Sequence, residues 1–353
     1  MHREGSTLRF MLVGAGFGET HLGWLTECTD ASVEVLCYQK NKARALDLAE
    51  RYGVPQVSDD PIQAIADGGI DALAVVSPPD THEALISAGL EAGLLVFSDK
   101  PLASSAQATA LLVERARAAA NGAFVTFQWR VNPGLRRLRE VCAQGDLGTV
   151  VRVDLEFHHD FLAGPTTAWP WRHRRETAGA GTLGDQGVHM FDLLGWLAPG
   201  AWSVVAGTSS VAWPRRSHEG GVVECETEDI ADVLLADTAG PARARVLVSR
   251  VSAGRRGLRV VVHGTKGYAV LSANPDSGSA TLTVVTGEPL APSVTNFGPH
   301  SMNPYEFVLT RIARGVEMDS TGVADFSAGH AAQLLLEEAL ERGCGNPGIV
   351  QES

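Results

Sequence analysis

The sequence lacks the features of secreted, membrane-spanning and metal-dependent proteins. Its cysteines are odd in number and have no metal-site spacing, so we expect reduced thiols and no metal; they are Cys28, Cys37, Cys142, Cys225 and Cys344. No apolar run is long enough to span a membrane. Residues 1–7 also lack the apolar core of a secretion signal. These absences predict a cytoplasmic protein that does not insert into a membrane.

Positive charge is also scarce. The chain carries 29 Lys and Arg residues against 41 Asp and Glu residues, a formal net charge of −12. That balance argues against non-specific binding of nucleic acid, and it is compatible with a cationic substrate. A length of 353 residues is enough for two domains, each with its own core.

Two patterns divide the chain near residue 128. Before it, short apolar strands alternate with helical segments, as in residues 8–13, 42–52 and 72–76. This alternation predicts a parallel, doubly wound sheet over residues 1–127. After it, strand-like runs separated by Gly, Pro, Ser and Asp turns predict a large, mostly antiparallel sheet within residues 128–353. The two closing helices can pack back toward the first domain.

A glycine-rich loop follows the first strand and precedes a helix: Gly14-Ala15-Gly16-Phe17-Gly18. Glycines in such a loop let the backbone approach a pyrophosphate, which the helix N-terminus then holds. The strict G-x-G-x-x-G pattern fails, because its sixth place is Glu19. With strand, loop, helix and second strand in register, a dinucleotide site is still favoured over a plain tight turn.

The end of the second strand bears on the choice of cofactor. An NAD site usually has an acidic residue there for the adenosine ribose. This chain has Tyr38 at that place, followed by Lys40, Lys42 and Arg44. The cations could meet a 2′-phosphate and Tyr38 could stack on adenine, so we expect NADP, with NAD as the alternative. The alternative to a phosphate-binding role is that these cations belong to the solvent-exposed first turn of a helix, although lysines in a first turn oppose the helix dipole.

A second cluster of ionisable residues lies in the second half of the chain. Asp185, His189 and Asp192 have spacings that place them on one face of a helix over residues 183–197. Apolar neighbours predict that this face is partly buried, and burying a carboxylate and an imidazole is costly unless they are paired or used. The segment is therefore either a proton-handling site or a helix capped by Asp185 with a core histidine.

Lys100 follows a strand in the sequence Asp99-Lys100-Pro101. Ligands of open α/β sheets bind at that edge, and the proline fixes an extended turn that would direct Lys100 into the crevice. The alternative is an exposed loop lysine.

Other candidates have structural explanations that are as good. His158-His159-Asp160 ends a strand and could touch substrate or hold a metal. The segments Trp129-Arg130 and Trp169-Pro170-Trp171-Arg172 could line a sugar pocket, or the tryptophans could belong to the core. The acidic run Glu224, Glu226, Glu228 and Asp229 is expected to be a solvated loop.

Together these motifs resemble the Gfo/Idh/MocA family of NAD(P)-dependent oxidoreductases. Besides the glycine loop, the resemblance rests on Val75-Val76-Ser77-Pro78-Pro79-Asp80-Thr81-His82, Glu91-Ala92-Gly93, Asp99-Lys100-Pro101, Trp171-Arg172, residues 179–189 and His263-Gly264-Thr265-Lys266-Gly267. The family usually has Glu-Lys-Pro where this chain has Asp99. The resemblance covers nearly the whole chain in the right order. It implies a Rossmann domain followed by an open-sheet α/β domain, with the active site in the cleft.

The resemblance also implies roles for residues. It makes Lys100, Asp185 and His189 the catalytic group. We place the cofactor against Gly14, Gly16, Phe17, Gly18, Tyr38, Lys40, Lys42, Ser77, Pro78, His82 and Asp99. Substrate contacts are expected from Lys100, Arg130, His158, Trp171, Arg172 and Asp185.

The expected activity is hydride transfer to or from a secondary alcohol or ketone carbon of a sugar, aminosugar or cyclitol, as an NADPH-dependent ketoreductase. Two alternatives are a non-redox member that uses NAD transiently, of glycosidase or eliminase type, and a non-catalytic nucleotide sensor. We also expect a homodimer or homotetramer built through the second-domain sheet, since helices can cover only one of its faces. Coverage by long loops within residues 272–300 is the alternative.

Overall fold

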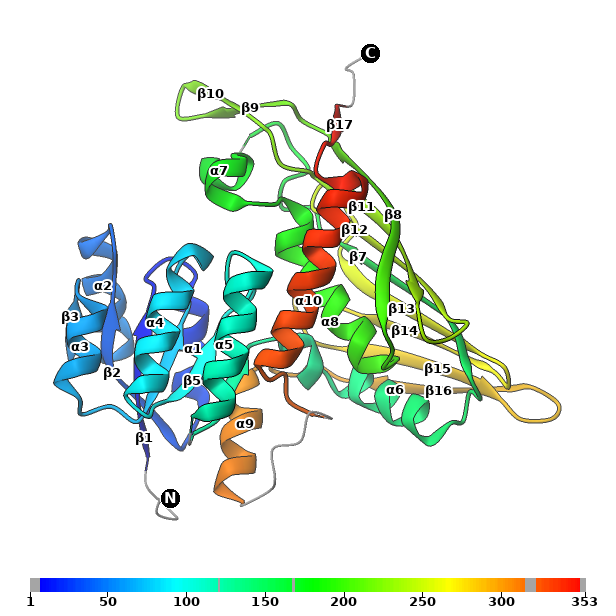
Figure 1. Ribbon diagram of the computed structural model, residues 1–353, viewed down its shortest axis with the longest axis horizontal. Coiled ribbons are helices and arrows are strands. Elements are labelled where there is room, and N and C mark those ends of the chain that lie inside the picture. The colour runs from blue at the N-terminus through cyan, green and yellow to red at the C-terminus, as the bar shows by residue number, and fades with distance from the viewer. Residues whose placement is uncertain (1–6, 120, 167–168, 315–321, 350–353) are drawn as a thin grey trace. The chain divides into compact units, whose positions relative to one another are not determined.

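The computed structural model of the protein describes residues 7–119, 121–166, 169–314 and 322–349. The chain divides into two compact units (Figure 1). The first comprises residues 1–131 and 303–330, and the second comprises residues 132–302 and 331–353. Among the described residues, no helix has the length and apolar content needed to cross a membrane.

The first unit contains a six-stranded parallel sheet, which confirms the predicted doubly wound fold. Its strand order is β3-β2-β1-β4-β5-β6, so the order reverses between the central strands β1 and β4. The strands are β1 (Leu8–Val13), β2 (Ala31–Cys37), β3 (Gln56–Ser58), β4 (Ala72–Val75), β5 (Leu95–Ser98) and β6 (Ala123–Val125). Open α/β sheets bind ligands at the carboxyl ends of strands where the order reverses. Here those ends lead into the glycine loop and into Ser77.

Helices of the first unit form two contact groups, as expected for a sheet covered on both faces. One group contains α1 (Gly18–Glu27), α2 (Lys42–Tyr52) and α9 (Pro304–Ala313). The other contains α3 (Pro61–Asp67), α4 (His82–Glu91) and α5 (Ala106–Ala118). Local signals fix their ends: Asn41 and Asp60 cap α2 and α3 with their side chains, and Gly53 ends α2 at a φ of 68°.

The second unit is built on a nine-stranded mixed sheet, most of whose neighbours are antiparallel. Its order is β16-β15-β14-β13-β7-β12-β11-β8-β17. The strands are β7 (Val150–His158), β8 (Trp202–Val211), β11 (Ile230–Asp237), β12 (Arg243–Ser249), β13 (Gly257–Gly264), β14 (Tyr268–Ala273), β15 (Ala280–Thr286), β16 (Ala291–Phe297) and β17 (Gly348–Ile349). A separate hairpin pairs β9 (Arg215–His218) with β10 (Gly221–Glu224).

Two helices pack on one face of this sheet, as Figure 1 shows: α6 (Pro133–Gln144) and α8 (Val188–Leu197). Alternation along β7 and β12 explains this, since Leu155 and Val246 are buried whereas Asp154 and Arg245 are on the opposite side. Three short helical segments, η3 (Pro170–His173), α7 (Arg175–Ala178) and η4 (Leu183–Gly187), precede α8. The long helix α10 (Phe326–Ala339) begins in the first unit and ends in the second, and the π-helical turn η5 (Leu340–Cys344) follows it.

The alternative that long loops cover the sheet is wrong for residues 272–300. Residues 272–300 do not form a long covering loop, because they contain the strands β15 and β16. Strand β16 was hard to foresee, because it lacks alternation and contains Pro292, as an edge strand can.

Candidate functional site

The glycine loop has the three features that a pyrophosphate site needs. At Gly14 φ is 125°, and an added Cβ would lie 2.7 Å from the carbonyl group of Val76. At Gly16 an added Cβ would have no atom within 4 Å, so the backbone there is open to a ligand. At Gly18 it would lie 2.9 Å from a methyl group of Leu12, so this glycine allows close packing of α1 on β1. Tight turn, ligand approach and helix packing are the roles of the three motif glycines, and Gly18 takes the third role in place of residue 19.

Arg44 and Glu19 brace this loop. The Arg44 guanidinium donates to the carbonyl oxygen of Ala15 at 2.7 Å and to that of Gly16 at 3.2 Å. It also contacts the Glu19 carboxylate at 3.1 Å, and Arg51 binds the same carboxylate at 2.8 Å. Glu19, which replaces the last glycine of the strict pattern, thus provides a carboxylate that binds both arginines. The Arg44 side chain is therefore engaged with the loop.

The residues expected to contact the adenosine ribose of the cofactor follow β2. Tyr38 is buried against the core of the first unit, whereas Lys40 and Lys42 are exposed at the start of α2. No acidic residue stands between Cys37 and Lys42.

The loop after β4 contains Ser77 and Pro78, and His82 at the start of α4 contacts both this loop and the loop after β5. The His82 ring is buried, with Nε2 2.7 Å from the Ser77 carbonyl oxygen and Nδ1 3.2 Å from that of Leu102. Burial lowers the pKa of His82, and its ring lies between the two loops. The Ser77 hydroxyl lies 2.6 Å from that of Thr81. His82 therefore lies behind the loop surface and braces it.

Asp99 and the half-buried Lys100 follow β5. The Asp99 carboxylate accepts a hydrogen bond from the Thr126 hydroxyl at 3.0 Å and lies 3.9 Å from Nε2 of His21. His21 is fully buried, with Nδ1 2.7 Å from the Tyr305 hydroxyl, and burial lowers its pKa. The sequence analysis did not single out His21 or Tyr305, since their contact joins residues far apart in the chain. Together they support the backbone from which Lys100 extends.

In the second unit, Asp185 lies inside the π-helical turn η4, so it is not the cap of α8. Its carboxylate accepts a hydrogen bond from Nη1 of Arg172 at 2.7 Å, and both side chains are about a quarter exposed. His189 and Asp192 follow in α8 and are buried, as the apolar neighbours predicted. π-Turns are frequent at functional sites. An accessible, arginine-bound carboxylate thus precedes a buried histidine on one continuous helical segment.

The tryptophans that were expected to line a sugar pocket or to belong to the core differ in exposure. Trp129 and Arg130 belong to the first unit and are buried, and Arg130 donates to the carbonyl oxygen of Val323 at 3.2 Å. This favours the core explanation for that pair over a substrate contact. Trp169 and Trp171 are exposed, so the core explanation is wrong for them. The Arg172 guanidinium lies over both of their rings, 5.5 Å and 5.1 Å from the centroids.

His158 and His159 have different surroundings. Nδ1 of His158 lies 2.8 Å from the Ser252 hydroxyl, and Nε2 lies 4.0 Å from Glu156. Burial lowers the pKa of His159, whereas the charge of Asp185 acts in the opposite direction. The Asp160 carboxylate lies 3.7 Å from Nδ1 of His159. Among the described residues, no group of three or more His, Cys, Asp or Glu side chains could hold a metal ion.

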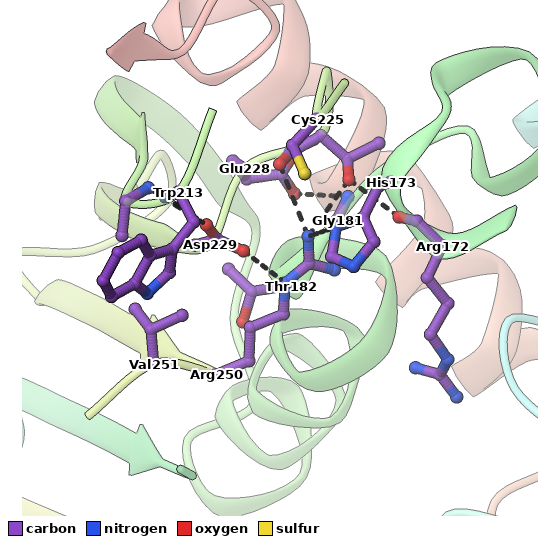
Figure 2. Close-up of polar contacts among 12 residues, drawn as sticks. Arg172, His173, Gly181, Thr182, Trp213, Cys225, Glu228, Asp229, Arg250 and Val251 are labelled. Carbon is purple, nitrogen blue, oxygen red and sulfur yellow. Dashed lines mark hydrogen bonds and ion pairs between the residues drawn. The ribbon is translucent and has the colours of Figure 1, made fainter. Parts of the chain in front are cut away.

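The end of the acidic run belongs to a buried ion-pair cluster (Figure 2), so the expectation of a solvated loop is wrong for Glu228 and Asp229, whereas Glu224 and Glu226 are exposed. Asp229 is 0% exposed and lies between two arginines that are each 1% exposed, Arg250 at 2.8 Å and Arg216 at 3.5 Å. Buried charges need such partners. The arginines come from β9 and from the end of β12, so local sequence could not pair them with Asp229.

This cluster also holds the chain that leads to Asp185. Arg250 donates to the Thr227 hydroxyl at 3.1 Å, and that hydroxyl donates to the Arg172 carbonyl oxygen at 2.7 Å. The Glu228 carboxylate accepts from the backbone N–H groups of Gly181 at 2.8 Å and Leu183 at 3.0 Å, although burial raises its pKa. Figure 2 shows the Arg172 side chain pointing away from the cluster. The buried polar groups therefore hold the backbone and leave the guanidinium for Asp185.

Comparisons with known proteins agree with this geometry. Residues 8–127 match the oxidoreductase family with an NAD-binding Rossmann fold, and residues 135–270 match the Gfo/Idh/MocA C-terminal domain. The chain is 26% identical to inositol 2-dehydrogenase of Rhizobium meliloti, covering 95% of this chain and 96% of that protein. It is 25% identical to levoglucosan dehydrogenase of Pseudarthrobacter phenanthrenivorans, over 52% of this chain and 47% of that protein.

The fold is also that of a solved levoglucosan dehydrogenase in complex with NADH and L-sorbose. The TM-score is 0.84 at 20% identity, covering 97% of this chain and 98% of that one. With both domain matches in order along the chain, the protein belongs to the Gfo/Idh/MocA family of oxidoreductases.

Proposed function

We propose that the protein transfers a hydride between a nicotinamide dinucleotide and a secondary carbinol or ketone carbon of a sugar or cyclitol. The observation that carries the proposal is the Arg172–Asp185 pair beside two exposed indole rings. Carboxylate and guanidinium groups bind hydroxyls, and aromatic faces suit the C–H faces of sugar rings. The relatives named for levoglucosan and inositol support the same substrate class.

Each proposed catalytic residue has a distinct task. The bound cofactor supplies or accepts the hydride. In the reductive direction His189 gives a proton to the carbonyl oxygen, and Lys100 donates a hydrogen bond to that oxygen as negative charge develops on it. Asp185, held by Arg172, orients the neighbouring hydroxyls.

The proposed cofactor is NADPH, used mainly for reduction. Tyr38 occupies the place of the ribose-binding acid, and the exposed ammonium groups of Lys40 and Lys42 can meet a 2′-phosphate. The proposed preference for NADPH rests on these two lysines, because the Arg44 side chain is engaged with the carbonyl oxygens of the glycine loop.

A homodimer or homotetramer through the open sheet is part of the proposal. Figure 1 shows no helix of the second unit's described residues on the face opposite α6 and α8. That face carries exposed apolar side chains such as Val205 and Leu234 beside the ion pair of Asp232 with Arg245. Light scattering at micromolar concentration tests it: a mass near the 37.3 kDa of one chain would contradict an oligomer. A cytoplasmic location is proposed too, in keeping with five free cysteines.

A screen of keto sugars, sugars and cyclitols with NADH, NADPH and their oxidised forms tests the activity. We expect net change of nicotinamide absorbance with at least one member of the panel. Product formation without net cofactor turnover would instead support transient use of NAD, and binding without any product would support a nucleotide sensor.

A further inference from the structure

His21 is a buried polar residue to which the proposed mechanism gives no task. It lies in the first turn of α1, directly after the glycine loop, and is 0% exposed. Its Nδ1 atom lies 2.7 Å from the Tyr305 hydroxyl, whereas Nε2 has no hydrogen-bond partner among the described residues. Buried polar atoms without a partner are uncommon in folded proteins, so this nitrogen calls for an explanation.

The unpartnered nitrogen lies near the Asp99 carboxylate. The distance from Nε2 of His21 to Oδ1 of Asp99 is 3.9 Å, and the Thr126 hydroxyl donates a hydrogen bond to the same oxygen at 3.0 Å. Since 3.9 Å is longer than a hydrogen bond, His21 acts on the carboxylate electrostatically. Burial lowers the pKa of His21, while the charge of Asp99 raises it and that of Lys100 lowers it. The ring therefore interacts with both residues that follow β5.

Tyr305 fixes the orientation of the His21 ring. Tyr305 is 0% exposed, and its backbone N–H donates to the Asn303 side chain at 3.0 Å. The same Asn303 side chain donates to the Trp24 carbonyl oxygen at 2.7 Å, which ties the start of α9 to α1 beside His21. A phenol hydroxyl that donates to Nδ1 leaves the ring proton on Nε2, the nitrogen nearer Asp99.

We propose that His21 is a positioning residue for Lys100. Tyr305 donates to Nδ1, the ring carries its proton on Nε2, and this N–H holds the Asp99 carboxylate and with it the loop from which Lys100 extends. The inference rests on the proposed function, in which Lys100 donates to the carbonyl oxygen. His21 and Tyr305 are fully buried and the Asp99 side chain is 14% exposed, so solvent screens the interaction little.

Variants of the two buried residues test the inference through kcat with an accepted keto sugar. His21→Leu removes the N–H, and we expect kcat to fall about three- to tenfold, as for the loss of one buried hydrogen-bonding group. His21→Gln places an amide N–H near the position of Nε2 and should keep most of kcat. Tyr305→Phe removes only the hydroxyl and should cause part of the loss. The double variant His21→Leu, Tyr305→Phe should lose no more than His21→Leu alone, because both residues act through one N–H.

NMR of the protein labelled with ¹³C at the lysine ε-carbons reports on Lys100 without any substrate. The chain has four lysines, at positions 40, 42, 100 and 266, so Lys100→Met identifies the signal. We expect this signal to move in His21→Leu and in Tyr305→Phe, and to stay near its wild-type position in His21→Gln. The matched control is Tyr52→Phe, which removes a hydroxyl from a ring packed against the same core as Tyr305. That control should leave both kcat and the Lys100 signal at wild-type values.

The two measurements separate this inference from the proposed function. A Lys100 signal that stays in place in His21→Leu would overturn the inference, as would equal losses of kcat in His21→Gln and His21→Leu. Tyr305→Phe keeps the ring packing and decides the question if His21→Leu does not fold: wild-type kcat with an unmoved signal would overturn the inference. A protein that turns over no sugar, but whose Lys100 signal depends on the His21 N–H, would contradict the proposed function and support the positioning of Lys100 by His21.

Discussion

The Thr227 hydroxyl donates a hydrogen bond to the Arg172 carbonyl oxygen at 2.7 Å. Thr227 in turn accepts from Arg250, whose partner Asp229 is fully buried. A continuous polar chain therefore runs from the buried ion pair of the second unit to the residue that holds Asp185. The buried charges serve the site by fixing the backbone from which Arg172 extends.

Replacing Thr227 tests this link. Thr227→Val keeps the shape but removes the hydroxyl, so the Arg172 backbone loses its anchor and Asp185 its fixed partner. We expect kcat to fall about three- to tenfold, roughly the worth of one buried hydrogen bond, with unchanged affinity for the nicotinamide cofactor. Thr227→Ser restores the hydroxyl and should restore kcat. Wild-type kcat in Thr227→Val would show that the chain does not position Arg172.

The buried ion pair should matter mainly for stability. Asp229→Asn leaves Arg216 and Arg250 without a charged partner in the core, and we expect a loss of about 3–5 kcal/mol in the free energy of unfolding. Asp47→Asn is the matched control, because its pair with Arg51 is 63% and 46% exposed. That variant should lose at most about 1 kcal/mol. Urea unfolding of both proteins measures the difference, and equal losses would refute a special role for burial.

His173 should make stability depend on pH. Burial, followed by the charges of Arg250 and Arg216, lowers its pKa from 6.5 to about 4. The unfolded chain therefore takes up a proton below pH 6.5 that the folded protein takes up only near pH 4. Stability should thus fall as the pH drops through this window, and His173→Gln should reduce the slope. His21 and His82, whose pKa values burial also lowers, are present in both proteins, so parallel curves would contradict the assignment to His173.

Cofactor choice should depend on two exposed lysines. The double variant Lys40→Ala, Lys42→Ala should weaken NADPH binding by about tenfold or more and leave NADH binding nearly unchanged, because only NADPH carries the 2′-phosphate. Fluorescence titration of both reduced cofactors measures this. Tighter binding of NADH by the wild-type protein, or no loss for NADPH in the variant, would assign the protein to NAD.

Sequence reasoning reached the fold because its signals are local. The strand over Leu8–Val13 and the helix over Lys42–Tyr52 have the bounds that periodicity predicts. The glycine loop was likewise readable from its neighbours. The pairing of Asp229 with Arg216 and Arg250 was not, because these contacts depend on which strands meet in the sheet.

The candidate site was predictable only in part for the same reason. Asp185 and His189 stand out by spacing along one helical segment. By contrast, the contacts of Arg172 with Asp185 and of His21 with Tyr305 join segments whose approach only the fold creates.

Transfer of deuterium from NADPH to the product tests the proposed hydride transfer. The cofactor carries deuterium at the transferred position, and the product from an accepted keto sugar or ketocyclitol is examined by mass spectrometry and NMR. The account predicts one deuterium on the new secondary carbinol carbon, formed about 10²–10⁴-fold more slowly by Lys100→Met and His189→Ala at unchanged cofactor affinity. A product without deuterium, or near wild-type rates in either variant, would contradict it.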